Sequence, residues 1–199
     1  MIDLPRAAAI IAHHAAALEG RRETHPAALW QAISDNHRYN SLLWDEEDLA
    51  RRRNAPDAEI AANKRAIDGH NQKRNDAIER IDEALVAALA DAPRLRDARL
   101  SSETAGSMID RLSILSLKIH HMRLQTERGD VERPHIEACQ ARLERLIEQC
   151  GDLAACLDRL LAECRAGSSV FKVYRQFKMY NDPALNPAVY NESRRPSRS

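Results

Sequence analysis

Amide and charged side chains interrupt the apolar face of a segment that the sequence predicts to be a long helix. In residues 27–52, counting about 100° per residue, the apolar stripe also carries Asn36, Asn40, Glu47 and Arg51. A lone buried amide costs about 1–3 kcal/mol, and a lone buried charge costs more. These side chains must therefore satisfy one another inside the fold, or line a site that a ligand completes.

The next long segment repeats the interruption, because its isoleucine face also carries Lys64, Asn71, Arg74 and Asn75. In residues 101–122, one face is apolar, and a nearly opposite face carries Ile114 and Leu117 together with Asp110. A helix that is apolar on two sides is predicted to be a central one, packed on both. Two explanations stay open. One is a network of hydrogen bonds between helices that fixes their register, and the other is a polar pocket inside the bundle.

An anionic ligand is the chemistry that these residue types favour. Arg and Lys on helix faces bind anions without a glycine-rich loop, and amides orient a ligand through hydrogen bonds. The candidate anion-binding cations are Lys64, Arg74, Arg111 and Lys118, and the orienting amides are Asn40, Asn71 and Asn75. The candidate acids or bases are Glu47, Asp68 and Asp110. The expected ligand-binding set is completed by Trp44, His121, Arg175 and Lys178.

The sequence lacks the residue patterns that a metal centre, a catalytic nucleophile or a phosphate-binding loop needs. A carboxylate-bridged metal bundle needs Glu-x-x-His on two helices, and only Glu132 to His135 has that spacing, with Pro134 placing it at a helix start. No nucleophile elbow, Walker loop or dinucleotide fingerprint is present. We therefore expect no metal site and no cofactor.

The elements that position these residues are predicted to be helices. Ala, Leu, Arg and Glu dominate the 199 residues, and only eight are aromatic, which argues against a β-sandwich or barrel. Turn signals separate five helical segments: Leu4 to Leu18, Thr24 to Arg52, Pro56 to Ala90, Ser101 or Ser102 to Gly129, and Pro134 to Gly167. A shorter aromatic helix is expected over Val170 to Tyr180. The sequence thus predicts an all-α antiparallel helical bundle of about five helices plus a short C-terminal helix, with one domain over residues 1–190 and a disordered tail over 191–199.

Charge balance, hydropathy and cysteine usage indicate which partners and which cellular compartment we expect. Thirty Lys or Arg balance thirty Asp or Glu, so the general footprint of a nucleic-acid binder is missing, and we expect no nucleic-acid partner. The first apolar stretch is interrupted by His13 and His14 and is too short for a membrane span, so we expect no membrane insertion. The four cysteines are expected to be small core residues in a reducing cytoplasm.

Four ordered motifs carry a family resemblance. They are NHRYNSLLWDEEDLAR (36–51), KRAIDGHNQKRNDAIERID (64–82), SSETAGSMIDRLSILSLKIHHM (101–122) and YRQFKMYNDPALNP (174–187). Together they resemble the bacterial domain-of-unknown-function family 4254 over about residues 25–187. The resemblance implies an all-helical cytoplasmic protein, often encoded near glycosyltransferases of envelope polysaccharide synthesis. The family has no established activity to carry over.

Two hypotheses about function follow. In the first, the polar pocket binds or acts on an anionic metabolite, a phosphorylated or nucleotide-linked sugar. In the second, the chain is a non-catalytic interaction module accessory to a glycosyltransferase, and the buried polar residues only specify packing. A homo-oligomer fits either hypothesis. Convergence of Glu47, Lys64, Asn71 and Asp110 on one cavity would favour the first, and a dry, fully paired network would favour the second.

Overall fold

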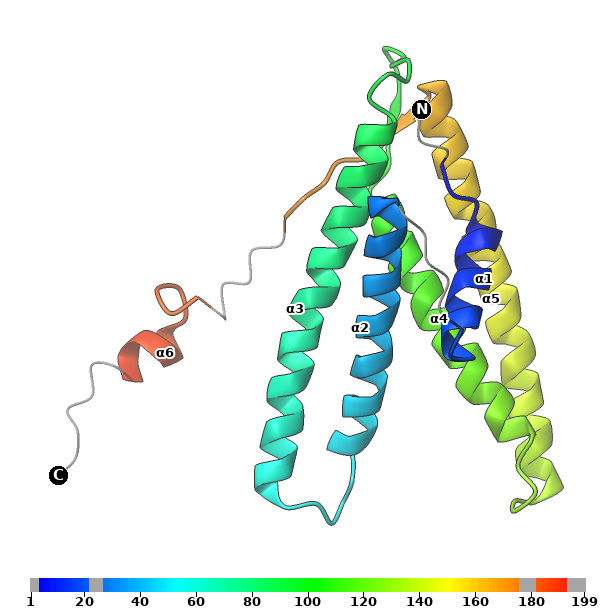
Figure 1. The fold of residues 1–199 in the computed structure, drawn as a ribbon, viewed down its shortest axis with the longest axis vertical. Helices are drawn as coiled ribbons and strands as arrows, with labels where there is room; N and C mark the ends of the chain where they lie inside the picture. Colours follow the sequence, from blue (N-terminus) through cyan, green and yellow to red (C-terminus); the bar gives the residue numbers. More distant parts are fainter. Residues whose placement is uncertain (1–3, 22–26, 176–181, 193–199) are drawn as a thin grey trace.

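Two long helical hairpins form the body of the molecule in the computed structural model, which describes residues 4–21, 27–175 and 182–192. Helices α2 (Ala28–Ala50) and α3 (Asp57–Ala88) make one hairpin, and α4 (Ala105–Thr126) and α5 (Arg133–Ala166) make the other (Figure 1). The hairpins meet near the C-terminal ends of α3 and α5 and diverge toward the α2–α3 and α4–α5 turns. The predicted all-α fold is confirmed.

Helix α1 (Ala7–Leu18) packs on α4 and α5, and α4 contacts each of the other four helices α1, α2, α3 and α5. This central position confirms the two-faced pattern of residues 101–122. The close packing of α4 on α3 depends on Gly106, because a Cβ there would lie 2.7 Å from the Ile78 carbonyl oxygen. The Gly106 N–H donates to Asp82 Oδ1 over 2.6 Å, so α3 caps the start of α4.

The start of α4 differs from the prediction. Thr104 is the N-cap rather than Ser101 or Ser102, and its Oγ1 accepts a hydrogen bond from the Ser107 N–H at 3.2 Å. The reason is that the chain before it is extended. Strand β1 (Arg99–Leu100) pairs in parallel with β2 (Ser169–Val170), and the Ser101 N–H continues this ladder by donating to the Val170 carbonyl.

Helix α5 ends at Ala166, and its C-cap Gly167 adopts a φ of 78°. The absence of a side chain on Gly167 leaves room for the Pro93 carbonyl. Cys139, Cys150 and Cys164 are buried on this helix as predicted, and all four cysteines are free thiols. Cys156 is exposed, so the prediction that it is a core residue is wrong. It lies outside the four-and-three spacing that the three buried cysteines follow.

The prediction of a helix over residues 170–180 is wrong for the part of this range that the structure describes. Val170 belongs to β2, and residues 171–175 form no helix, because the strand pairing sets an extended backbone. Phe171 is buried, whereas Tyr174 is 73% exposed. The short C-terminal helix is instead α6 (Pro187–Glu192), which includes the first two residues of the expected disordered tail. Residues 176–181 and 193–199 lie outside the described chain.

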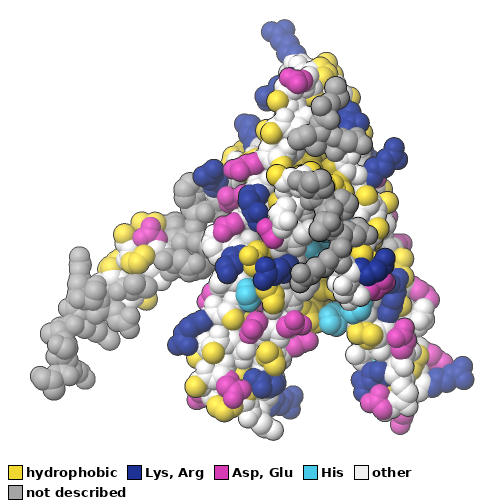
Figure 2. Space-filling model, viewed as in Figure 1, with side chains coloured by type: hydrophobic (Ala, Val, Ile, Leu, Met, Phe, Trp, Pro, Cys, Tyr) yellow, Lys and Arg dark blue, Asp and Glu magenta, His cyan; other side chains and the backbone are white. Residues whose placement is uncertain are grey.

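Among the residues described, none of the helices combines the length and apolar character that crossing a membrane demands. On the face shown in Figure 2, Lys and Arg side chains intermix with Asp and Glu over both hairpins, and the molecule is open between the diverging ends.

Candidate functional site

A buried polar network joins α2 to α4 at the point where the hairpins begin to diverge. The Asn36 and Asn40 Nδ2 amides donate to Oδ1 of Asp110 over 2.8 and 2.9 Å, and Asn40 Nδ2 also lies 3.0 Å from Ser113 Oγ. Asn36 is fully buried, and Asn40 and Asp110 are nearly so. The apolar stripe of α2 therefore turns polar because it meets a carboxylate on the central helix.

Histidines extend this network toward α1. His37 Nδ1 and Ser113 Oγ are 2.8 Å apart, and the His37 ring stacks on the His14 ring with centroids 4.4 Å apart. Burial, followed by the charge of His13, lowers the His37 pKa to about 4. Burial, with the charge of His37 next, also lowers the His14 pKa well below its usual value. At neutral pH both rings are uncharged, as a close imidazole stack requires.

The network borders a cleft of about 340 Å³ between α2, α3 and α4, which we call the amide cleft. Its polar lining consists of Asn40, Trp44, Glu47, Asp48, Arg51, Asn71 and Arg74, and its apolar lining of Leu43, Ile114 and Leu117. Five predicted site residues thus lie on one cleft: Asn40, Trp44, Glu47, Asn71 and Arg74. Asp110 does not line it, but lies behind Asn40 and holds the Asn40 amide.

Arg74 is the cation of the amide cleft with the longer ion pair, which it makes with the buried carboxylate of Asp110. Its Nε lies 3.9 Å from Asp110 Oδ1, and that buried nitrogen has no hydrogen-bond partner in the described chain. Arg51, by contrast, pairs with Glu47 over 2.7 Å at the C-terminal end of α2. A guanidinium with an unused N–H beside two amides can bind an anion through several hydrogen bonds.

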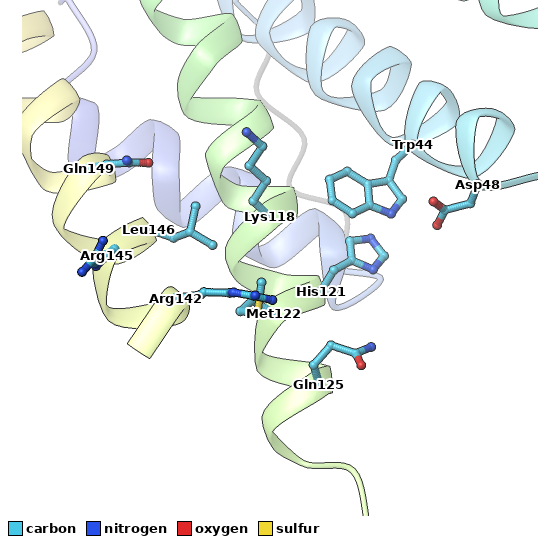
Figure 3. Close-up of a pocket in the computed structure, with 10 residues that line it drawn as sticks. All are labelled: Trp44, Asp48, Lys118, His121, Met122, Gln125, Arg142, Arg145, Leu146 and Gln149. Atoms are coloured by element: carbon cyan, nitrogen blue, oxygen red, sulfur yellow. The ribbon is translucent and has the colours of Figure 1, made fainter. Parts of the chain in front are cut away.

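A second cleft of about 570 Å³ lies between the hairpins, and we call it the cationic cleft. Its polar lining consists of Lys118, His121, Gln125, Arg142, Arg145 and Gln149, with Asp48 at one side, and Met122 and Leu146 supply apolar surface. Trp44 and Asp48 belong to both clefts. The Trp44 ring stacks on His121 with centroids 4.4 Å apart and planes 4° apart, and Arg142 extends from α5 toward α4 (Figure 3).

Several predicted site residues lie away from both clefts. Lys64 and Asp68 form an exposed pair at 3.1 Å on α3, and Arg111 pairs with Glu103 over 2.6 Å. Arg175 pairs with Glu83 over 3.2 Å and is 74% exposed. Asn75 is buried beside Arg74, 3.4 Å from an Arg74 terminal nitrogen. Lys178 falls outside the residues that the structure describes. Of the four residues expected to converge on one cavity, Glu47 and Asn71 line the amide cleft, Asp110 lies behind it, and Lys64 is away from it.

Sequence reasoning missed the α5 side of the cationic cleft. Arg142, Arg145 and Gln149 follow helical spacing beside the buried cysteine and leucine seam, which is the pattern of any solvated helix face. The spacing of Asp48 four residues after Trp44 could have signalled its place on the same face of α2. Within the described residues, no three His, Cys, Asp or Glu side chains gather as metal ligands would.

Fold and site together define an all-α protein of two splayed hairpins with polar clefts where they separate. The family model of the "Protein of unknown function (DUF4254)" matches residues 30–173, and the chain belongs to this family. The matched range contains every residue that lines the two clefts. No curated protein and no solved structure gives a significant match.

Proposed function

We propose that the protein binds an anionic metabolite, a sugar phosphate, in the amide cleft. The observation that carries the proposal is Arg74, a half-buried cation whose Nε has no hydrogen-bond partner in the described chain, at a cleft that also presents two amides. The Arg74 side chain is 26% exposed, so a phosphate oxygen in the cleft would accept from the exposed part of this guanidinium. In the predicted alternative of a purely structural network, the long ion pair with Asp110 is the contact that holds the Arg74 Nε.

The remaining lining favours a ligand with hydroxyl groups. Asn71 makes no side-chain hydrogen bond within the described chain, and the carboxylates of Glu47 and Asp48 are hydrogen-bond acceptors for hydroxyls. The formal charges of the lining cancel, since Glu47 and Asp48 balance Arg51 and Arg74. A ligand with one compact anionic group and several hydroxyls matches this balance better than a polyanion does.

The network behind the cleft gives Asp110 a positioning role in this proposal. Its Oδ1 accepts from both α2 amides, which fixes Asn40 and places a negative charge near Arg74. Glu47 and Asp48 are the carboxylates that line the cleft, and Glu47 is the predicted acid or base for any proton transfer. Lys64, Asp68 and Arg111 have no part in this site, because their charged groups lie on exposed pairs outside it.

Thermal unfolding with a ligand panel tests the proposal. Hexose 1-phosphates and hexose 6-phosphates should raise the melting temperature, since a ligand at a hundred times its dissociation constant adds about 2.7 kcal/mol to stability. Unphosphorylated hexoses should have little effect. Asn71→Ala should weaken the shift, whereas Lys64→Ala, a substitution of an exposed residue on the same helix, should leave it unchanged.

The accessory-module hypothesis predicts the opposite pattern. In that case no sugar phosphate stabilises the protein, Asn71→Ala alters only its intrinsic stability, and affinity purification recovers one dominant protein partner. A panel without any stabilising phosphate compound would overturn the sugar-phosphate proposal.

A further inference from the structure

The cationic cleft presents two facing rows of hydrogen-bond donors. Lys118, His121 and Gln125 repeat at intervals of three and four along α4, and Arg142, Arg145 and Gln149 do the same along α5. Because residues at these intervals share a helix face, each row points to one side of the cleft. Met122 and Leu146 lie within the two rows and give the cleft its apolar surface.

The charge of this cleft is unbalanced, in contrast to that of the amide cleft. Lys118, Arg142 and Arg145 have no ion-pair partner among the residues described, and neither α4 nor α5 contributes a carboxylate to the lining. Asp48 on α2 is the lone acidic group of the lining. Three cations against one carboxylate leave a local charge of about +2, which attracts a ligand with two or more negative charges.

The wall of the cleft formed by Trp44 and His121 favours a planar group. The two rings are nearly parallel, with planes 4° apart, and they come from different hairpins. Burial, followed by the charge of His120, lowers the His121 pKa, so the stack is uncharged at neutral pH. Aromatic side chains of this kind stack on nucleobases in single-stranded nucleic-acid complexes.

We propose that the cationic cleft is a second ligand site, for a nucleoside diphosphate. The phosphates would lie between the Lys118 side and the Arg142 side of the cleft, and the base would contact the Trp44–His121 wall. A volume of about 570 Å³ falls within the usual range for small-molecule sites, about 300–1,000 Å³. Lys118 and Arg142 belong to the cationic cleft alone, and Arg74 belongs to the amide cleft alone.

Calorimetric titration with ADP, inorganic pyrophosphate and adenosine tests this proposal. ADP should bind more tightly than pyrophosphate, because pyrophosphate lacks the ring, and more tightly than adenosine, because adenosine lacks the charge. Arg142→Ala should weaken ADP binding by about tenfold or more. Arg159→Ala, a substitution of an exposed arginine elsewhere on α5, is the matched control and should leave ADP affinity unchanged.

Two outcomes would overturn the proposal. One is the absence of ADP binding at millimolar concentration, and the other is pyrophosphate binding as tightly as ADP, which would leave the ring wall without a role. The two sites are separable, because Arg74→Gln should abolish sugar-phosphate stabilisation while ADP affinity stays, and Arg142→Ala should do the reverse. Failure of one binding event therefore leaves the other testable.

Discussion

Asn40 and Asp110 stand 70 positions apart in the chain, yet the Asn40 amide donates to the Asp110 carboxylate over 2.9 Å. This bond joins the two hairpins where they begin to separate. It also links a buried network to an open cleft, because Asn40 lines the amide cleft and Asp110 does not. One side chain therefore belongs both to the interior of the fold and to the candidate binding site.

Removing the buried partner of Asp110 should destabilise the protein. Asn36→Ala takes away a fully buried donor at 2.8 Å, and we expect the free energy of unfolding to fall by about 1–3 kcal/mol. Urea denaturation measures this change. The control is Gln72→Ala, which removes an exposed bond to Asp76 on α3 and should cost less than about 0.5 kcal/mol. Equal effects of the two substitutions would contradict the structural role of the network.

Two glycines in helices should respond to alanine with opposite signs. A Cβ on Gly106 would lie 2.7 Å from the Ile78 carbonyl oxygen and 2.8 Å from the Asp82 carboxyl carbon, so Gly106→Ala should cost about 1–3 kcal/mol. Gly69 in α3 has nothing within 4 Å of the same atom, and Gly69→Ala should add about 0.5–1 kcal/mol through helix propensity. Thermal melts of both variants test the packing of α4 on α3, which a stabilising Gly106→Ala would disprove.

The stacked histidines predict that acid destabilises the fold well above the range of ordinary carboxylates. Well above the usual histidine pKa of about 6.5, these imidazoles are neutral in both states and contribute no pH dependence. As the pH falls from 6.5 to about 4, the unfolded chain binds a proton at His37 while the folded chain does not, so stability decreases. The largest slope is about 1.4 kcal/mol per pH unit for each such group.

Denaturation curves between pH 7 and 4 measure this slope. His37→Gln should reduce it, whereas substitution of His135 by glutamine, at an exposed position at the start of α5, should leave it intact. An unchanged slope in His37→Gln would mean that the His14–His37 stack does not govern the acid response.

How far the sequence predicts the site depends on what each residue faces. Asn36, Asn40 and Asp110 are predictable, because the cost of burying an amide on an apolar stripe demands a partner on a neighbouring helix. Lys64 shares its face of α3 with Asn71 and Arg74, but it lies near the start of this helix. There α4 has diverged from α3, and the face is exposed (Figure 1). Periodicity identifies a face, and only the angle between the hairpins determines whether a third helix covers it.

The same angle explains why Arg142 and Arg145 escaped prediction. On α5 they look like a solvated face beside the seam, and they become part of a cleft because α2 brings Trp44 against His121 across the gap. The strand pairing of Arg99 with Ser169 could not be predicted from the sequence either, because a ladder of two residues leaves no periodic pattern. Local propensity therefore predicts the helices, whereas the relative placement of the hairpins requires the structure.

The most direct measurement for the central claim is the fluorescence of Trp44 in a Trp30→Phe variant, in which it is the sole tryptophan. Titration with a hexose phosphate should change this emission saturably, because Trp44 lines the amide cleft. The change should vanish in Arg74→Gln and persist in Lys64→Ala. An emission that does not respond to any hexose phosphate, or a response that survives Arg74→Gln, would contradict sugar-phosphate binding in the amide cleft.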